Sequence, residues 1–505
     1  MGCTVRARRW TLAAVTAASG LLVGTVAWVP MQADASTSGG LLGNVLQAVS
    51  TVTGSPTPSG SASPSGSPTP SDSASPSPTA SSSPTSSPKP PKVRWMPPTG
   101  VVISNPLGSL KQRQVIIKRV RDGIAHTRKG HTIMFATYDF DRKDLANALI
   151  RAYNRGVNVQ MVLNDNFQTP QEFRLQKLMG DDATKPSFVK FCTGSCRAFR
   201  GNLHMKVYAF TGTGGANDVI MDSSANLTGA APSHQWNDEV TIVGNKRLFT
   251  VWRKVFNQLK RDKPVKHRRI TFTSRDLDVA FHRTATGAVE PITRGRTVVA
   301  RKKAGGGDPV LAQLNKIGCK TGGKYGVKGH TTVRLMEYAW YGTRGIPIAH
   351  KVASLAKQGC NVMAIMSHSD KAVEDILAAA KIPMRDATWW YGQKLSTDGH
   401  SIVYGSRQYS HLKVLAINGR YGNKNMRTVF TGSENWDNIS FMNDEVTLQL
   451  VGDSTYYPYL SMFQHQWNTG ATHAIGLKPT SPAPMENPKD PQPTAGPITV
   501  PDPGN

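Results

Sequence analysis

The feature that most constrains the fold is an internal repeat of polar residues. His204 and Lys206 are followed by Ser224 and Asn226, and then by an Asn-Asp-Glu segment that ends at Glu239. The matching residues of the second copy are His411, Lys413, Ser433, Asn435 and Glu445. The separation between matching residues stays between 206 and 209, which duplication explains far better than chance. The chain is therefore predicted to contain two similar halves.

Each half also begins with a strand–helix–strand pattern. The three segments lie at residues 131–138, 144–153 and 157–163 in the first half, and at 331–340, 348–357 and 361–366 in the second. Such a pattern is typical of a βαβ unit in a parallel sheet. The repeated polar residues follow on a strand, a hairpin, a second strand and an elbow. We predict an α/β fold of two homologous βαβ-rich halves with mixed, largely parallel sheets packed around a pseudo-twofold axis.

Low-complexity sequence bounds the folded part of the chain. Residues from about 55 to 92 are almost entirely Ser, Pro, Thr, Gly and Ala, a composition that cannot bury a core. A second Pro-rich stretch ends the sequence. We therefore divide the chain into a disordered linker at 36–92, a first half at 93–270, a second half at 271–476 and a disordered tail at 477–505.

The N-terminus has the pattern of a secretory signal peptide. A basic stretch at 6–9 precedes an apolar stretch at 11–29, and Ala33-Asp34-Ala35 fits a cleavage site for small residues. We expect residues 1–35 to be removed near Ala35 and the protein to be secreted. An uncleaved anchor is the alternative, and the Arg8-Arg9 pair leaves the export route open.

The chain is strongly basic, with 60 Lys and Arg against 33 Asp and Glu, a net charge of +27. A basic surface favours phosphate-rich partners such as nucleic acid, anionic lipid or an anionic cell-wall polymer. The basic runs at 260–269 and 294–303 are expected to be solvated surface that can steer polyanions. A secreted protein with no such partner remains the plain alternative.

Four cysteines remain once Cys3 leaves with the signal peptide. An even number in an exported chain favours disulfides, and we expect Cys192 to pair with Cys196 and Cys319 with Cys360. Zinc is the rival, but no matching cluster of His ligands flanks these cysteines.

The repeated residues suit chemistry on a phosphodiester. His-x-Lys on a strand places both side chains on one face. Two Lys and two Asn can surround the non-bridging oxygens as charge builds in the transition state. One His can attack phosphorus while the other protonates the departing alkoxide. Each imidazole needs an acceptor for its other ring proton, and we expect Glu239 and Glu445 to supply it, either within each half or across the halves.

These residues resemble the phospholipase D superfamily, whose signature is His-x-Lys-x4-Asp followed by a Gly/Ser-x-Asn segment. The resemblance covers both halves and implies one active site at their interface, no metal or other cofactor, and a covalent phosphohistidine. In two-motif secreted members the first His is usually the nucleophile, which implies that role for His204 and the acid/base role for His411. It also implies that Lys206 and Lys413, with Ser224 and Ser433, bind the substrate, and that Asn226, Asn435, Glu239 and Glu445 take part in catalysis.

The sequence departs from this signature at one position in each copy. Thr211 and Asn418 stand where the family has Asp. In the family that Asp is a structural hydrogen-bonding residue more than a participant in bond making. Thr and Asn can also accept hydrogen bonds at a strand end, so we expect a working site.

The bond class leaves the substrate open, because the superfamily contains phospholipases, nucleases and lipid synthases. The chain resembles secreted actinobacterial-type phospholipases D, which implies hydrolysis of phosphatidylcholine to phosphatidate and choline at a membrane surface. A metal-independent secreted nuclease is the first alternative, and a degenerate polyanion-binding relative is the second. We expect a monomer with no obligate protein partner.

Overall fold

The computed structural model describes part of the chain. It covers residues 94–477 with gaps at 167, 199, 267–268, 283–289, 295–296, 303–306, 391–392, 396–401 and 405–406, and short pieces between 479 and 500. All of these residues belong to one unit, 89–505. The expected signal peptide and linker, and most of the tail, lie outside the described residues.

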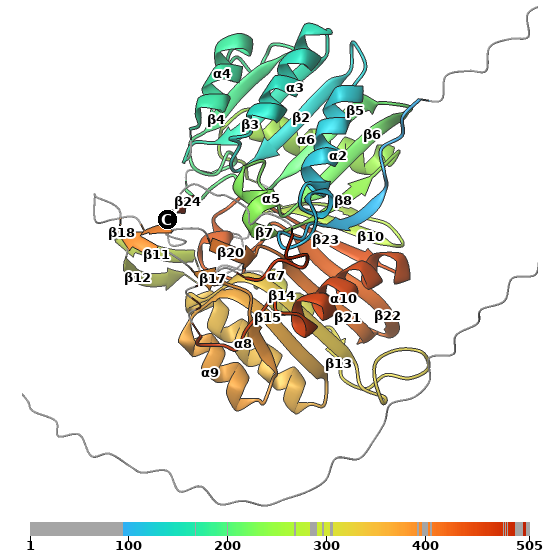
Figure 1. Cartoon of the computed structure of the whole chain (residues 1–505), viewed down its shortest axis with the longest axis vertical. Helices are drawn as coiled ribbons and strands as arrows, with labels where there is room; N and C mark the ends of the chain where they lie inside the picture. The colour runs from blue at the N-terminus through green and yellow to red at the C-terminus, as the bar shows by residue number, and fades with distance from the viewer. Residues whose placement is uncertain are drawn as a thin grey trace, which may run out of the picture. The chain divides into compact units, whose positions relative to one another are not determined.

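The first half of the chain builds a seven-stranded sheet in the order β1-β8-β6-β5-β2-β3-β4. Its elements are β1 (Gly100–Ile103), α1 (Leu110–Arg113), α2 (Val115–His126), β2 (Thr132–Thr137), α3 (Lys143–Asn154), β3 (Asn158–Asn164), α4 (Pro170–Met179), β4 (Phe188–Cys192), β5 (Val207–Thr213), β6 (Ala216–Ser223), α5 (Ala230–His234), β7 (Gln235–Trp236), β8 (Asp238–Ile242) and α6 (Lys246–Leu259). In Figure 1, α2, α3 and α4 lie on one side of this sheet and α6 lies on the other.

The second half builds a larger sheet in the order β16-β15-β14-β21-β22-β23-β10-β9, with β13 paired to β21. Its elements are β9 (Ile270–Thr273), β10 (Leu277–His282), β11 (Glu290–Arg294), β12 (Thr297–Lys302), α7 (Pro309–Leu314), β13 (Ile317–Gly318), β14 (Thr332–Trp340), α8 (Gly342–Lys357), β15 (Asn361–Ser369), α9 (Lys371–Ala379), β16 (Met384–Asp386), β17 (Trp389–Trp390), β18 (Gln393–Leu395), β19 (Ile402–Tyr404), β20 (Arg407–Ser410), β21 (Lys413–Tyr421), β22 (Lys424–Gly432), the short 3-10 helix η1 (Ile439–Phe441), β23 (Glu445–Val451), α10 (Asp453–Asn468) and β24 (Ile498–Val500).

The two sheets share one plan. In each, strands joined by a helix pair in parallel, namely β2 with β3 and β14 with β15. The central strands that carry the repeated motif, β5 with β6 and β21 with β22, form antiparallel hairpins. The predicted α/β fold with mixed sheets is confirmed, and the parallel pairs gather at one side of each sheet because only those strands have helical crossovers.

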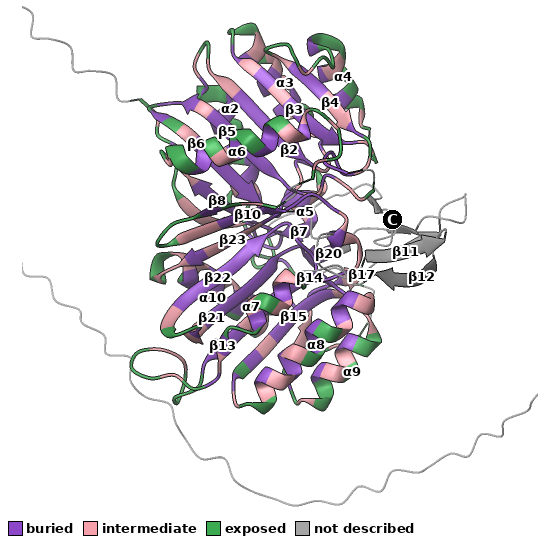
Figure 2. Ribbon diagram, turned by 180° about the vertical axis from the view of Figure 1, so that it is seen from behind, coloured by how far each residue is buried: buried purple, intermediate pink, exposed green. Residues whose placement is uncertain are grey.

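Helix α3 shows why the predicted segments fold as they do. Its buried side chains Leu145, Ala148, Leu149 and Ala152 recur at helical spacing, so they form one stripe against the sheet. The chain leaves the helix at Gly156, whose φ of +82° suits a residue without a side chain. Figure 2 shows the same division on other helices, with buried residues facing the strands and exposed residues facing outward.

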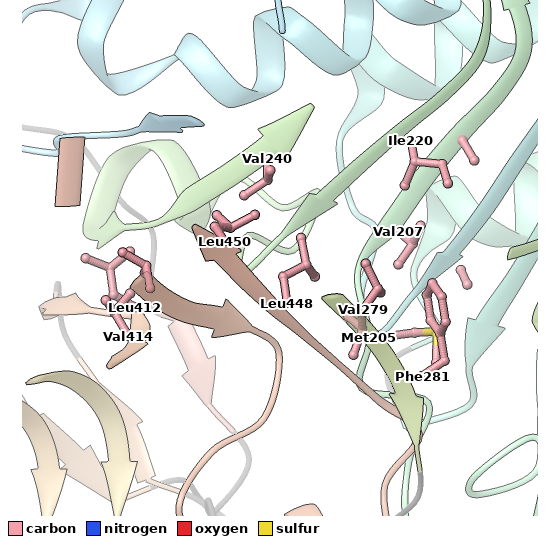
Figure 3. Packing of buried hydrophobic residues seen from close by; sticks show 14 of the residues in the cluster. Met205, Val207, Ile220, Val240, Val279, Phe281, Leu412, Val414, Leu448 and Leu450 are labelled. Carbon is pink, nitrogen blue, oxygen red and sulfur yellow. The ribbon is translucent and has the colours of Figure 1, made fainter. Parts of the chain in front are cut away.

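One buried cluster joins the two halves. Figure 3 shows side chains from the first sheet packed with side chains from the second. Val207 and Val240 belong to the first sheet, while Val279, Val414 and Leu448 come from the second. Burying each such side chain stabilises the fold by about 1.5–3 kcal/mol. The halves are therefore parts of one packed structure.

Both expected disulfides are present. Cys192 is bonded to Cys196, and Cys319 is bonded to Cys360. Among the residues that the structure describes, no helix has the length and apolar character needed to cross a bilayer.

Candidate active site

The two His-x-Lys motifs stand at equivalent places in the two sheets. His204 lies just before β5, and His411 lies just before β21. The backbone N–H of His204 donates to the carbonyl of Asp444, at 3.0 Å, and that of His411 donates to the carbonyl of Trp236, at 2.9 Å. Each half thus supplies the segment that lies beside the other half's histidine.

His204 is held by Glu445 from the second half. Its Nδ1 lies 2.9 and 3.0 Å from the two carboxylate oxygens, so the ring N–H donates to the carboxylate. Glu445 is fully buried, and the Ser433 hydroxyl and the Asn443 amide also donate to it. The expected pairing across the halves is therefore present for this histidine, and Nε2 is the ring nitrogen that does not face Glu445.

His411 is held by a different kind of group. Its Nδ1 lies 2.9 Å from the side-chain oxygen of Asn237, which also accepts a hydrogen bond from Ser224 Oγ at 3.2 Å. The two histidines therefore differ electrostatically, because one ring proton faces a carboxylate and the other faces a neutral amide.

The expectation that Glu239 holds a catalytic histidine needs correction. Its carboxylate lies 3.4 Å from Arg119 Nη1 and accepts a hydrogen bond from Thr241, away from His411. The reason is a difference in register. Ser224 donates its backbone N–H to the carbonyl of Asp238, whereas Ser433 donates to that of Val446. Asp238 and Val446 are therefore structurally equivalent, and so are the residues before them, Asn237 and Glu445. By sequence, however, Asn237 matches Asn443, so the structural alignment of the two Asn-Asp-Glu segments is shifted by two residues from the sequence alignment.

Two buried ammonium groups face the histidines. Lys206 is 0% exposed and Lys413 is 4% exposed, and each donates to the carbonyl of its own motif histidine. Tyrosine rings pack against both, with the Lys206 Nζ 5.3 Å from the centre of Tyr138 and the Lys413 Nζ 4.7 Å from that of Tyr338. These aromatic rings are favourable neighbours for ammonium groups because of cation–π attraction.

The tyrosines were missed by the sequence analysis. Tyr138 and Tyr338 also contact His204 and His411 edge-on, with ring centres 5.3 and 4.6 Å apart. Both fall in segments predicted as the first strand of each half, at 131–138 and 331–340. Their matching places in the two halves were the signal that could have identified them.

The electrostatics of the site favour neutral imidazoles. Burial, followed by the nearby ammonium groups of Lys206 and Lys413, lowers the pKa of both His204 and His411 well below 6.5. Burial also lowers the pKa of Lys413 to about 8 and raises that of Glu445 to about 7. Burial, followed by the nearby ammonium group of Lys413, also lowers the pKa of Lys206 well below 10.5. An anionic ligand would favour the protonated form of both amines and offset their repulsion.

The remaining motif residues divide into two groups. The hydroxyls of Ser224 and Ser433 donate to Asn237 and Glu445, so the structure places them behind the histidines, although they were expected to bind substrate. The side-chain oxygens of Asn226 and Asn435 are buried and have no hydrogen-bond partner among the described residues. These two amides are therefore the ones left to meet a ligand.

The positions that depart from the family signature accept hydrogen bonds as expected, although Thr211 lies inside β5 and Asn418 inside β21, and neither is at a strand end. The Thr211 hydroxyl accepts a hydrogen bond from the backbone N–H of Thr132 at 2.8 Å. The Asn418 side chain accepts one from the N–H of Gly326 at 3.2 Å. Both replacements thus serve as structural acceptors.

The described residues hold no group of three or more His, Cys, Asp and Glu side chains arranged as metal ligands.

Comparisons with known proteins give one family match and several similar solved structures. Residues 120–260 match the family model described as cardiolipin synthase, PLD-like domain. A comparison with curated protein sequences finds no match. The similar solved structures include polyphosphate kinase from Porphyromonas gingivalis, at 12% identity over 75% of this chain and 53% of that one, with a TM-score of 0.45. The chain thus spans about half the length of that kinase.

Two other similar structures are phosphatidylserine synthase from Haemophilus influenzae Rd KW20 and Nuc from Salmonella typhimurium, a phospholipase D family member. The synthase is 12% identical over 76% of this chain and 90% of that one, with a TM-score of 0.44. Nuc is 19% identical over 32% of this chain and 95% of that one, with a TM-score of 0.24. The residues matched by the family model, 120–260, include His204 and Lys206 of the first motif.

Proposed function

We propose that the protein is a phosphodiesterase that works through a covalent phosphohistidine at His204 without a metal ion. The observation that carries the proposal is the pairing of two histidines, each held by the other half, beside two buried lysines. His204 Nε2 attacks phosphorus, and the bond from phosphorus to the leaving oxygen breaks as His411 donates a proton to that oxygen. Water then attacks phosphorus, His411 takes the proton, and the bond to His204 breaks.

The difference between the two acceptors supports this assignment of roles. The His204 ring gains positive charge as its bond to phosphorus forms, and the carboxylate of Glu445 stabilises that charge at 2.9 Å. His411 faces the neutral Asn237 oxygen, which orients the ring through Nδ1 but does not stabilise the positive charge of the protonated imidazole as a carboxylate would. His411 is therefore the better proton donor of the pair.

The cations and amides stabilise the transition state. Lys206 and Lys413 supply positive charge where the non-bridging oxygens become more negative. The amides of Asn226 and Asn435 can donate to the same oxygens once their NH2 groups face the ligand. The two lysines are already buried and held by hydrogen bonds to the histidine carbonyls, so these cations need little reorganisation during the reaction.

The substrate proposed for the first test is phosphatidylcholine, whose head-group ester would yield phosphatidate and choline. Choline release from vesicles is measured with the purified mature protein in EDTA, with His204→Ala as the control. Release that persists in EDTA and is lost in the variant supports the proposal. Release that requires an added metal ion, or that continues in His204→Ala, contradicts it.

A second substrate class, a soluble phosphodiester polymer such as DNA or RNA, is favoured by the surface around α6. The exposed cations of this surface are Lys246, Arg247, Arg253, Lys254, Arg261, Lys263, Lys266 and Arg269. Asp262 is the one acidic residue of the sequence between 246 and 269. The apolar side chains of α6 are buried in the core, so this face offers charge without the exposed apolar groups that insert into a membrane.

The same protein samples distinguish the two classes. A polymer bound along α6 should dissociate steeply as salt rises, because each phosphate contact releases counterions. Cleavage of plasmid DNA in EDTA, lost in His204→Ala, with no choline release, would assign the site to nucleic acid. Choline release without DNA cleavage would assign it to lipid.

A further inference from the structure

Asp444, the residue before Glu445, is fully buried and contacts the first half through its side chain. Its carboxylate lies 2.6 Å from Arg197 Nε and 2.9 Å from Ser195 Oγ, and it also accepts the backbone N–H of Arg197 at 3.2 Å. Both members of the ion pair have side chains with 0% exposure. A buried carboxylate is thus surrounded by three donors from one short segment of the other half.

The backbone of Asp444 is attached just as firmly to the histidine strand. Its carbonyl accepts the N–H groups of His204 and Met205 at 3.0 and 2.9 Å, and its own N–H donates to the carbonyl of Asn202 at 2.8 Å. Next along the chain, Glu445 directs its carboxylate to the His204 ring. Adjacent residues of an extended chain face opposite sides, so fixing Asp444 on one side fixes Glu445 on the other.

One of the donors lies in a covalently closed loop, and the other two belong to the residue that follows it. The disulfide between Cys192 and Cys196 encloses Ser195, and Arg197 follows directly. The Arg197 carbonyl is bound by the backbone N–H of Val265 at 3.0 Å, so the loop is also fixed from the segment after α6.

Among the described residues, the equivalent place beside His411 holds no ion pair of this kind. Trp236 occupies the place that corresponds to Asp444, since its carbonyl accepts the N–H of His411. An apolar residue therefore suffices at that place for the fold. A buried ion pair contributes little net stability compared with packed apolar side chains, so stability alone gives no reason for Arg197 and Asp444.

We propose that Arg197 and Asp444 are positioning residues for Glu445, and through it for His204, and that the Cys192–Cys196 loop keeps Arg197 in place. The proposal rests on the phosphodiesterase function proposed above. It assigns this contact to the histidine that forms the covalent intermediate, and it gives the small disulfide loop a role in turnover.

The test combines two variants of the ion pair. Asp444→Asn removes the charge at nearly constant volume. Arg197→Gln/Asp444→Asn removes both charges and leaves no unpaired one, which protects the fold if the single variant is unstable. We expect kcat to fall about 10- to 100-fold in both, as for other groups that orient a reacting residue, while KM changes less than about threefold. Wild-type kcat in the double variant would overturn the proposal.

The second disulfide provides a matched control. Cys319→Ser/Cys360→Ser opens a loop with a sequence separation of 41, and Cys192→Ser/Cys196→Ser opens one with a separation of 4. The longer loop constrains the unfolded chain more, so its loss should lower Tm more. The positioning role requires the opposite order for kcat, with the larger loss in Cys192→Ser/Cys196→Ser. A kcat that follows Tm across the two variants would overturn it.

A measurement without turnover separates this proposal from the proposed function. The ring Nδ1–H signal of His204, assigned by its absence in His204→Ala, is recorded by NMR in the free protein. It should shift or broaden in Arg197→Gln/Asp444→Asn and stay in place in Cys319→Ser/Cys360→Ser. An inactive wild type would refute the phosphodiesterase, whereas an unchanged ring signal in the ion-pair variant would refute the positioning role.

Discussion

Replacing Asn237 by Asp would give His411 the type of acceptor that His204 already has. The Asn237 oxygen lies 2.9 Å from His411 Nδ1, and both residues are buried. Asn and Asp have nearly the same shape, so the main change is one negative charge. In the wild type, burial and the nearby cations Lys413 and Lys206 lower the pKa of His411. The new charge acts in the opposite direction.

The size of the change follows from the distance. Opposite charges whose centres are about 4 Å apart attract by about 4 kcal/mol at an effective dielectric constant of about 20. Part of this is lost because a carboxylate must be buried. We therefore expect Asn237→Asp to raise the pKa of His411 by about 1–3 units.

The direction of the effect on rate follows from the proposed role of His411 as the acid. An acid must be protonated, so wild-type activity should fall as pH rises through the lowered pKa of His411, giving an acidic optimum. Asn237→Asp should shift the basic limb of the kcat/KM profile upward by about 1–3 units. The acidic limb, which reports the need for a neutral His204, should remain where it is.

The assay is the pH dependence of kcat/KM on whichever phosphodiester is hydrolysed, with Glu239→Gln as a control. Asn237→Asp also removes the side-chain NH2 group that donates a hydrogen bond to the Gln235 side-chain oxygen at 3.0 Å. An unfolding curve must therefore show that the variant is folded at each pH. A basic limb that stays in place in folded Asn237→Asp would refute the assignment of His411 as the acid.

Three further predictions concern stability. Gly432→Ala should lower the free energy of unfolding by about 1–3 kcal/mol or more and should also reduce kcat. The reason is that φ at Gly432 is +140° and the added Cβ would lie 2.2 Å from the carbonyl oxygen of Val446. Gly229→Ala is the control, because the added Cβ there meets open space and neither quantity should change. Burial raises the pKa of Glu239 to about 7, so the free energy of unfolding of the wild type should fall as pH rises from the ordinary pKa of a Glu to about 7. Calorimetry between about pH 4 and pH 8 should therefore show the stability of Glu239→Gln rising relative to the wild type by up to about 3 kcal/mol. A stability difference that stays constant over this pH range would contradict the prediction. Denaturant unfolding of Cys319→Ser/Cys360→Ser should show a loss of about 4 kcal/mol, and a loss under about 1 kcal/mol would refute the loop-entropy argument.

Much of the fold could be predicted because local patterns determine it. The strand–helix–strand segments agree with β2, α3 and β3 to within one or two residues, since alternation and helical spacing are properties of short windows. The duplication indicated which polar residues would come together, and His204, Lys206 and their counterparts do so.

The acceptor of His411 could not be predicted in this way. The matching Asn-Asp-Glu letters indicated Glu239, but the hydrogen bonds of Ser224 and Ser433 set a different register. Register depends on pairing with a distant strand, which similarity between short segments does not determine. The Arg197–Asp444 ion pair was hidden for a related reason, because its members are separated by 247 residues and nothing in either segment indicates the other.

The crossed holding of the histidines has a consequence for fragments of the chain. A piece ending after α6 would keep His204 and lose Glu445, and a piece beginning at β9 would keep His411 and lose Asn237. Neither piece could orient its own imidazole, however well it folded. Activity recovered on mixing two such pieces would report their reassociation directly, so the reaction itself could measure how strongly the two sheets bind each other.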